Sequence, residues 1–363
     1  MPKLIMLIGL PGSGKSTYAK RYIDNHLEDT VWCSSDNVRK VLYGDENIQG
    51  NPNTVFQHLH NDVEMYLRDG YNVIYDATNV TRKNRRGVIN KFKNLAEIEC
   101  HIVWAPYNEC VARDKERVKS VGEDVIRKFL YRWQSPNYDE GFKFIDVIYN
   151  CDEGWNRIHY SNCMLDNLKI PHDNPHHTLD IYEHSAAVQC YIMNKWPKSS
   201  ILEEAGSYHD LGKPMTKGYK SDENGKMIPI AHYYQHHCVG GYLVYGMYAD
   251  TPESRQKAVT CSWLVCNHME PYFDSKYYKS LEGMYKVWID QLHEADEAAH
   301  WIQGGKCMRP YHIEVSWIDY DTTNNDDVHE VRVYDNKKLH VISRWSTIGR
   351  SLGNTISIYM SNS

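Results

Sequence analysis

The chain has 363 residues, of which 42% are hydrophobic and 24% charged, and its formal net charge at pH 7 is −6. This length and composition are ordinary for a globular protein of two domains with an appendage, and no apolar run approaches the roughly 18 residues that cross a bilayer. The negative net charge argues against nonspecific binding along nucleic acid, but it is compatible with local binding of one end of a strand. The ten cysteines are scattered, so we expect reduced core residues and a cytoplasmic protein with no membrane association.

The first informative segment is a complete Walker A loop that spans residues 9–17, Gly-Leu-Pro-Gly-Ser-Gly-Lys-Ser-Thr. It follows an unbroken apolar run at residues 4–8, which predicts a buried parallel strand, and it leads into apolar residues at helical spacing. In this context backbone N–H groups wrap a triphosphate at the helix N-terminus. We expect ATP or another NTP to bind there, Lys15 to reach the β/γ-phosphates and Ser16 to ligate Mg²⁺. The loop residues expected to contact the nucleotide are Gly12, Ser13, Gly14, Lys15, Ser16 and Thr17.

Further strand-like runs at residues 31–33, 71–75 and 98–104 alternate with helical patterns. This alternation predicts an α/β domain with a parallel sheet, in which ligands bind beyond the carboxyl ends of the strands. After the second strand, Asp36 can take the proton from an attacking hydroxyl, and Arg39 can hold an acceptor phosphate one helical turn later. The alternative for this pair is a helix cap with a surface ion pair.

Two basic segments follow in the same domain. Residues 82–86, after Asp76, carry four charges that we interpret mostly as a solvated helix start. Arg113 and Arg117 stand four apart on a helix predicted over 109–119, so one helix face presents two guanidinium groups suited to a lid over phosphate.

The order of these motifs, ending with EGFKFIDVIYN at 140–150, resembles the kinase module of bacterial and phage polynucleotide kinase-phosphatases over about residues 1–150. The resemblance implies that Asp36 is the general base on a 5′-hydroxyl and that Arg39 contacts the acceptor phosphate. It further implies that Lys15 and Arg117 act on the transferring phosphoryl group, with Arg113 as a second lid arginine that contacts ATP. The chain follows the bacterial pattern Asp-Ala-Thr-Asn at 76–79, which leaves the role of Asp76 open. Because related folds phosphorylate small molecules, the resemblance defines the reaction better than the acceptor.

The composition changes after residue 150: eleven histidines lie between residues 172 and 300, whereas only four precede residue 150. His184, the adjacent pair His209-Asp210 and Asp296 combine neutral imidazoles with carboxylates, which suits a borderline or hard divalent metal ion. Together with the flanking segment Tyr-His-Asp-Leu-Gly-Lys-Pro at 208–214, they resemble the HD phosphohydrolase superfamily.

This second resemblance implies a two-metal site. One ion would be held by His184, His209, Asp210 and Asp296, and Asp210 would bridge to a second ion held by His236 and His268. Two such ions, drawn from Mn, Fe, Co, Ni or Zn, can activate a hydroxide and bind a phosphate ester.

Several neighbouring residues keep alternative interpretations. Lys213 is a candidate for stabilising phosphate charge, or else a surface lysine, and His237 competes with His236 as a ligand. His176, His177 and Asp180 either support His184 or form the entry to its helix.

From residue 310 the pattern turns to alternation, which predicts a strand at 312–317, a loop at 324–327 and a hairpin formed by 328–333 and 339–342. The expected organisation is therefore a P-loop kinase-like domain over 1–152, a linker over 153–175, an all-α HD domain over 176–305 and a small β-rich extension over 306–363. We assign no chemistry to the extension.

A kinase joined to a phosphohydrolase is useful if both act on the same kind of end. Broken RNA with a 5′-hydroxyl and a 2′,3′-cyclic phosphate cannot be sealed until a kinase restores the 5′-phosphate and a phosphatase clears the 3′ side. The combination predicts a bifunctional enzyme that heals the ends of RNA or DNA, with RNA favoured and a separate RNA ligase as a candidate partner.

Two alternatives remain open. One is a kinase for nucleosides or modified nucleobases fused to an HD nucleotide phosphohydrolase. The other is an ATP-sensing P-loop that gates the HD domain, which Asp36 and the arginine pair disfavour because a sensor needs no base. Sequence does not decide RNA against DNA, the HD metal, cyclic ester against monoester, or the oligomeric state.

Overall fold

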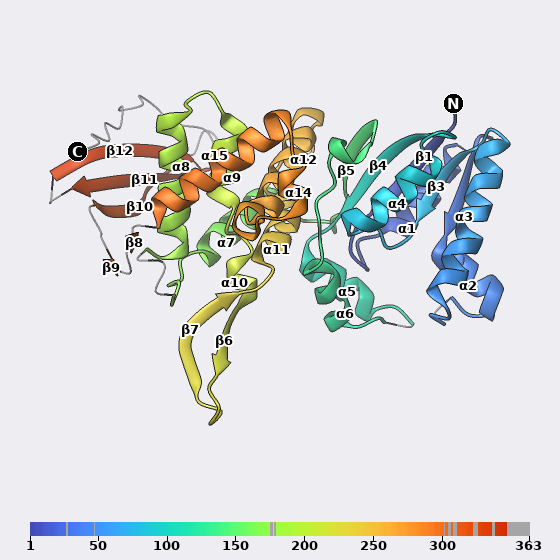
Figure 1. Ribbon diagram of the computed structural model, residues 1–363, viewed down its shortest axis with the longest axis horizontal. Coiled ribbons are helices and arrows are strands. Elements are labelled where there is room, and N and C mark those ends of the chain that lie inside the picture. Colours follow the sequence, from blue (N-terminus) through green and yellow to red (C-terminus); the bar gives the residue numbers. More distant parts are fainter. Residues whose placement is uncertain are drawn as a thin grey trace. The chain divides into compact units, whose positions relative to one another are not determined.

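The computed structural model describes residues 1–346 apart from 27, 47, 119, 175, 176, 178, 301, 304–305, 308–310, 322–325 and 336–337. The described chain forms two compact units, Met1–Trp155 with Ala249–Val259, and Asn156–Tyr248 with the residues from Thr260 onward. Figure 1 shows the elements of each unit. Residues 347–363, the end of the expected β-rich extension, lie outside the described residues. None of the described helices has the length and apolar character that crossing a bilayer requires.

The first unit is built on a sheet of five parallel strands in the order β2-β3-β1-β4-β5, which confirms the predicted parallel α/β architecture. The central strand β1 is buried on both faces from Leu4 to Ile8, as its apolar run predicts. Because all five strands point the same way, their carboxyl ends share one edge, and Leu7 of β1 pairs with Asp76 of β3 there. The strands are β1 (Lys3–Ile8), β2 (Thr30–Ser34), β3 (Asn72–Asp76), β4 (Glu97–Trp104) and β5 (Phe144–Tyr149).

Helices cover both faces of this sheet. On one face, Ala19 of α1 packs on Ile5, Leu7 and Ile74. On the other face, His60 of α3 contacts the hydroxyl of Tyr75 at 3.1 Å and its ring lies against Phe92 of α4. The helices of this unit are α1 (Lys15–Asp24), α2 (Ser35–Tyr43), α3 (Pro52–Arg68), α4 (Arg82–Phe92), α5 (Tyr107–Lys115), α6 (Glu123–Leu130) and the 3₁₀ turn η1 (Tyr138–Glu140).

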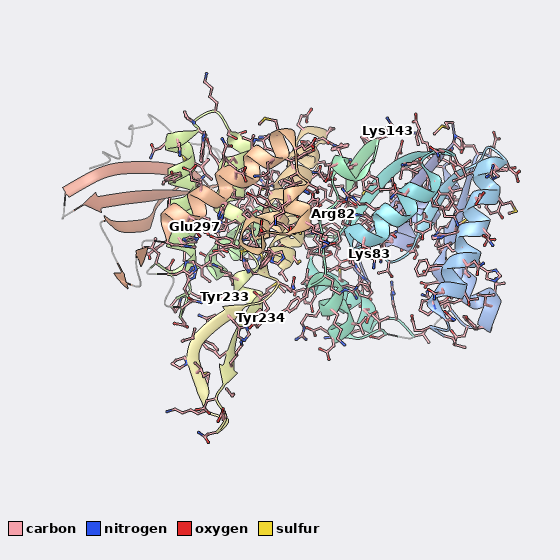
Figure 2. The ribbon with its side chains drawn as sticks, in the orientation of Figure 1. Arg82, Lys83, Lys143, Tyr233, Tyr234 and Glu297 are labelled. Carbon is pink, nitrogen blue, oxygen red and sulfur yellow. The ribbon has the colours of Figure 1, made fainter. Side chains whose placement is uncertain are left out.

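The basic run at the start of α4 is not mainly solvated as expected. Arg82 and Arg85 are buried, whereas Lys83 is exposed and Arg86 half-buried (Figure 2 labels Arg82 and Lys83). Arg85 donates two hydrogen bonds to Glu140, at 2.8 and 2.5 Å. Its remaining guanidinium nitrogen bonds the carbonyl groups of Asn79 and Gln134.

Arg85 therefore joins the nearby Asn79 to the distant segment that carries Gln134 and Glu140. The side-chain amide of Asn79 donates to the carbonyl of Leu7 at 2.9 Å, next to the phosphate-binding loop. The buried guanidinium thus helps to fix the end of β1 from which that loop departs.

The second unit is mainly helical. Helix α8 packs against both α9 and α15. The expected linker over 153–175 is wrong in part, because residues 157–167 form a helix of this unit whose Arg157 and Tyr160 bond the carbonyl groups of Met247 and Leu243. The helices are α7 (Arg157–Asn167), α8 (Ile181–Lys195), α9 (Ser200–Tyr208), α10 (Lys213–Thr216), α11 (His236–Leu243), η2 (Val244–Met247), α13 (Glu270–Phe273), α14 (Lys276–Lys279) and α15 (Gly283–Ala299), with α12 (Pro252–Asn267) belonging to this unit from Thr260 onward.

Strands interrupt this helical pattern earlier than expected. An antiparallel hairpin of β6 (Lys217–Ser221) and β7 (Met227–Tyr233) projects from the helices between α10 and α11 (Figure 1). After β8 (Ile302–Gln303) and β9 (Lys306–Cys307), the predicted strand and hairpin are confirmed as an antiparallel sheet of β10 (Tyr311–Asp321), β11 (Asp326–Asp335) and β12 (Lys338–Ser346). The loop expected at 324–327 is wrong for residues 326 and 327, which belong to β11, and its residues 324 and 325 lie outside the described residues.

Replacing Glu140 by Gln should destabilise the first unit by about 3–5 kcal/mol, because it leaves the buried charge of Arg85 without a counter-ion. The matched control is Arg86→Ala on the same helix, whose partly exposed side chain lies 3.7 Å from Asp139 and should contribute less than about 1 kcal/mol. Denaturant unfolding of the full chain measures both changes. Equal small effects of the two substitutions would contradict a structural role for Arg85.

Candidate functional site

The Walker A residues form a tight loop between β1 and α1. Gly12 and Gly14 have positive φ angles of 82° and 90°, and α1 begins at Lys15. The ammonium of Lys15 donates to the carbonyl groups of Gly9 and Leu10 at 3.0 and 2.9 Å, so it lies folded over the loop where a phosphate group would be bound.

The loop is enclosed by the neighbouring chain. A Cβ at Gly12 would lie 2.2 Å from the carbonyl oxygen of Cys110, and one at Gly14 would lie 2.0 Å from Nδ2 of Asn150. The same Asn150 amide donates to the carbonyl oxygen of Ser13 at 2.8 Å. These contacts explain why glycine is needed at both positions beyond its freedom in φ.

The strand next to the loop contributes a carboxylate that sequence analysis left without a role. Ser16 donates to Asp76, with 3.2 Å between Oγ and Oδ2. Burial raises the pKa of Asp76, while the charge of Lys15 and the hydrogen bond from Ser16 lower it. A serine hydroxyl beside a carboxylate is the oxygen donor set that Mg²⁺ uses in P-loop proteins.

Asp36 and Arg39 lie at the start of α2, whose N-cap is Ser34. They form an ion pair at 2.7 Å in which Asp36 is exposed and the Arg39 side chain is largely covered. Burial lowers the pKa of Lys15, the charges of Asp76 and Asp36 raise it, and that of Arg117 lowers it. The structure therefore brings Asp36 and Arg117 within electrostatic range of Lys15.

The expected arginine pair on one helix is wrong. Helix α5 ends at Lys115, and Arg117 lies in the bend that follows. The chain turns there because the carboxylate of Asp114 accepts hydrogen bonds from Ser120 Oγ and from the backbone N–H of Gly122.

Arg113 is also not presented to a nucleotide as a lid residue. Its guanidinium bonds Glu109, Asp152 and the carbonyl oxygen of Asn150. These hydrogen bonds occupy Arg113 and not Arg117, so Arg117 is the better candidate for a lid residue.

In the second unit the structure brings all six predicted ligands together in the interior, although they come from five helices or their ends. Asp180 and Glu183 form a capping box that fixes the start of α8, and His184 lies in its first turns. The other five are placed at the end of α9, at the start of α11, directly after α12 and within α15: His209, Asp210, His236, His268 and Asp296.

These side chains form two adjoining sets of three, His184–His209–Asp296 and Asp210–His236–His268, each with ligand atoms within 4.8 Å of one another. In the first set, Nε2 of His184 lies 2.9 Å from Oδ1 of Asp296 and 3.3 Å from Nε2 of His209. In the second, the Nε2 atoms of His236 and His268 are 3.1 Å apart.

Asp210 stands between the two sets. Its Oδ2 lies 3.3 Å from His209 Nε2 and 3.8 Å from His184 Nε2, whereas its Oδ1 lies 3.6 Å from His236 Nε2. Each carboxylate oxygen thus faces a different set of imidazoles, which is the arrangement that a bridging ligand requires.

Lys213 is buried rather than on the surface, and its ammonium lies 2.7 Å from Oδ2 of Asp210. Burial acts to raise the pKa of Asp210, but His209 and Lys213 hold it well below the usual range. Burial also lowers the pKa of His236 to about 4, which keeps its ring neutral and able to bind a metal ion.

Close backbone approach sets the position of the His209-Asp210 segment. A Cβ at Gly212 would lie 2.0 Å from the carbonyl oxygen of His236 and 2.7 Å from the backbone nitrogen of Gly240. Gly212 therefore lets the turn after α9 touch the start of α11, which brings Asp210 to His236.

Sequence reasoning missed two residues at this cluster. Tyr272 donates from its hydroxyl to Oδ2 of Asp296 at 2.9 Å, and His300 Nε2 lies 3.4 Å from Oδ1 of the same carboxylate. The histidine excess between 172 and 300 was the available signal for His300. Asp180 proves to be a helix cap, and His176 lies outside the described residues.

Comparisons with known proteins match the first unit to an AAA domain. A family model described as an AAA domain matches residues 4–136. L-seryl-tRNA(Sec) kinase of Methanococcus maripaludis is 26% identical over 210 residues, which cover 55% of this chain and 73% of that protein.

Two other relatives match shorter parts. A transcription factor, bHLH140 of Arabidopsis thaliana, is 27% identical over 44% of this chain and 17% of its own length. A chain of the Pnkp1/Rnl/Hen1 RNA repair complex is 27% identical, with a TM-score of 0.33, over 35% of this chain and 42% of its own length. The chain thus spans less than half of these two relatives. Residues 4–136 thus match an AAA domain, and the Walker A loop within them is of the kind that binds a nucleotide with Mg²⁺.

Gly14→Ala should weaken ATP binding by about tenfold or more, because the added methyl group displaces the Asn150 amide that holds the loop. Gly70→Ala is the matched control: its φ is 91°, but a Cβ there meets nothing within 4 Å. Both variants carry about 1–2 kcal/mol of backbone strain, so only the first should lose affinity in calorimetric titration with ATP. Equal affinities would contradict the role given to Asn150.

Gly212→Ala should destabilise the second unit by about 1–3 kcal/mol, since its methyl group overlaps backbone atoms that cannot rotate away. Gly87→Ala, in helix α4 with open space around the new Cβ, should be neutral or stabilising. The melting temperatures of the two variants, measured by thermal unfolding, give the comparison. An unchanged melting temperature for Gly212→Ala would show that the turn is not tightly held.

Proposed function

We propose that the chain is a bifunctional enzyme that heals nucleic-acid ends, with RNA as the favoured substrate. The kinase would phosphorylate a 5′-hydroxyl with ATP, and the second unit would remove a 3′-phosphate or 2′,3′-cyclic phosphate with divalent metal ions. The observation that carries the second activity is the placement of Asp210 between two sets of buried imidazoles. The first activity is supported by the charge of Asp36 within range of Lys15 in a P-loop kinase domain.

In the kinase step, the 5′-oxygen attacks the γ-phosphorus, the bond from that phosphorus to the β–γ bridging oxygen breaks, and ADP leaves. Asp36 receives the hydroxyl proton, while Arg39 holds the phosphate of the terminal nucleotide. Lys15 and Arg117 stabilise charge on the transferring group. Ser16 and Asp76 would hold Mg²⁺, which supplies neutralisation of the phosphate charge.

In the hydrolytic step, His184, His209, Asp210 and Asp296 would hold one ion, and Asp210, His236 and His268 the other. The donor set fits this role, because neutral imidazoles and ionised carboxylates suit borderline divalent metals such as Mn, Fe, Co, Ni or Zn. Ions bound there lower the pKa of water and neutralise phosphate charge. Lys213 orients Asp210 and adds positive charge beside the phosphate.

One observation favours a different acceptor for the phosphoryl group in the kinase reaction. A relative that covers 55% of this chain is named as a kinase of L-seryl-tRNA(Sec), so a hydroxyl carried on RNA by another group is an alternative to a 5′-end. The two acceptors are distinguished by supplying each with labelled ATP.

The decisive substrate is a short RNA with a 5′-hydroxyl and a 2′,3′-cyclic phosphate, incubated with the full chain, Mg²⁺ and Mn²⁺, with and without ATP. We expect 5′-phosphate only with ATP, and conversion of the 3′ end to a hydroxyl in both reactions. Parallel reactions contain free nucleosides or seryl-tRNA. Untouched RNA beside a phosphorylated nucleoside would overturn the proposal.

Asp36→Asn should lower 5′ phosphorylation by about 10²–10⁴-fold and leave 3′ processing intact, whereas Asp210→Asn should do the reverse. Asp124→Asn and Asp274→Asn are the controls, because both carboxylates are exposed and pair with nearby surface residues, Arg127 and Lys279. End-labelled RNA separated on a gel reports both activities at once. Loss of both activities in either folded variant would contradict two independent sites.

A further inference from the structure

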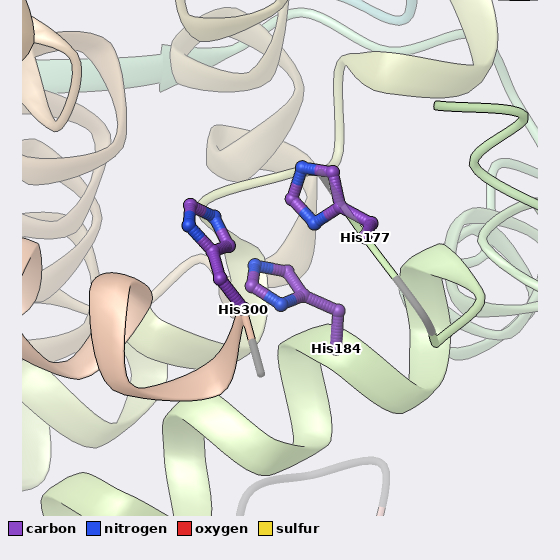
Figure 3. A group of neighbouring side chains, drawn as sticks. All are labelled: His177, His184 and His300. Carbon is purple, nitrogen blue, oxygen red and sulfur yellow. The ribbon is translucent and has the colours of Figure 1, made fainter. Parts of the chain in front are cut away.

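Beside the six predicted ligands lies a third group of histidines. His177, His184 and His300 have ring nitrogens within 4.8 Å of one another, and Figure 3 shows the three rings gathered around a common centre. His184 belongs to this group and also to the set with His209 and Asp296. The two groups are therefore parts of one continuous cluster.

Three imidazoles of this cluster converge on a single oxygen atom. Oδ1 of Asp296 lies 2.9 Å from Nε2 of His184, 3.4 Å from Nε2 of His300 and 3.6 Å from Nε2 of His209. Ligand atoms bound to one ion at about 2.1 Å are separated by about 3.0–3.4 Å, depending on geometry. The spacing of these four atoms is close to that of ligands around one ion.

His177 adds an unsatisfied nitrogen at the same place. Its Nδ1 is buried and has no hydrogen-bond partner among the described residues. A buried polar nitrogen without a partner costs about 1–3 kcal/mol, and a metal ion bound to it would remove this cost.

The orientation of the His177 ring is set by stacking on a neighbouring histidine. The ring of His172 stacks on it at 3.8 Å between centroids, and the hydroxyl of Tyr233 donates to the backbone carbonyl of His172 (Figure 2 labels Tyr233). His300 is held by its place directly after α15, one turn beyond Asp296. Both rings are thus positioned by the fold.

We infer that His177 and His300 are further ligands of the ion held by His184, His209 and Asp296, an inference that rests on the proposed metal centre. The resulting set is rich in imidazole and exceeds four ligands. It should select a borderline ion such as Fe²⁺, Co²⁺ or Ni²⁺ over Mg²⁺ or Ca²⁺, which prefer oxygen, and over a tetrahedral zinc site.

Cobalt is the probe that tests this, because its visible absorption depends on the number and kind of its ligands. The full chain is stripped with a chelator and titrated with Co²⁺, and the affinity and spectrum are compared for wild type, His177→Ala and His300→Ala. We expect each variant to bind Co²⁺ about tenfold or more weakly and to show a shifted band. His159→Ala, an exposed histidine on α7, should behave as wild type.

Free imidazole provides a second measurement. His300 is partly exposed, so added imidazole should enter the space left in His300→Ala and restore the wild-type cobalt band. Such rescue requires that the ring itself bind the ion. It would not occur if His300 only supported its neighbours.

The outcomes separate this inference from the proposed function. Unchanged affinity and spectrum in both variants, or weaker binding with an unchanged band, would overturn the ligand role of His177 and His300. If wild type bound no Co²⁺, or Asp210→Asn bound it as wild type does, the proposed metal centre itself would be wrong. Circular dichroism of the stripped variants confirms that they remain folded.

Discussion

Each unit has a buried charged side chain in its interior, Arg85 in the first and Asp210 in the second. An unpaired charge in such a place costs several kcal/mol, so the surrounding elements must supply its partners. In the first unit, Arg85 gathers Glu140 and two backbone carbonyl groups, and one of these belongs to the segment that holds the end of β1. In the second, Asp210 is enclosed by imidazoles and Lys213. The positions of the candidate functional groups follow from satisfying these charges.

The sequence predicts best those features that a short segment of chain determines by itself. The phosphate-binding loop lies within nine residues between an apolar run and an amphipathic helix, so Lys15 and Ser16 could be placed without knowledge of the fold. The parallel sheet followed from strand and helix patterns that alternate along the chain. The histidine–aspartate cluster draws on five helices, but its members stood out because the adjacent pair His209-Asp210 and the local excess of histidine mark them.

What could not be predicted depends on residues far apart. Nothing local shows that Arg85 is buried, since its partner Glu140 lies 55 positions away. The end of α5 before Arg117 depends on the carboxylate of Asp114 bonding residues beyond the turn. The hairpin β6–β7 was missed because apolar residues such as Met227 and Ile230 are exposed on it, so no buried face produces the usual alternation.

That hairpin is closed at its base by the contact of Gly212 with His236, and these residues stand next to Asp210 and at the start of α11. Tyr233, at the end of β7, stays tied to the cluster, because its backbone carbonyl lies 2.9 Å from Nδ1 of His236. The length of the hairpin beyond Tyr233 contributes little to the geometry of the cluster, because lengthening a closed loop costs only about 0.6 kcal/mol per doubling. The tip of the hairpin can therefore be shortened or extended while the ligands stay in place.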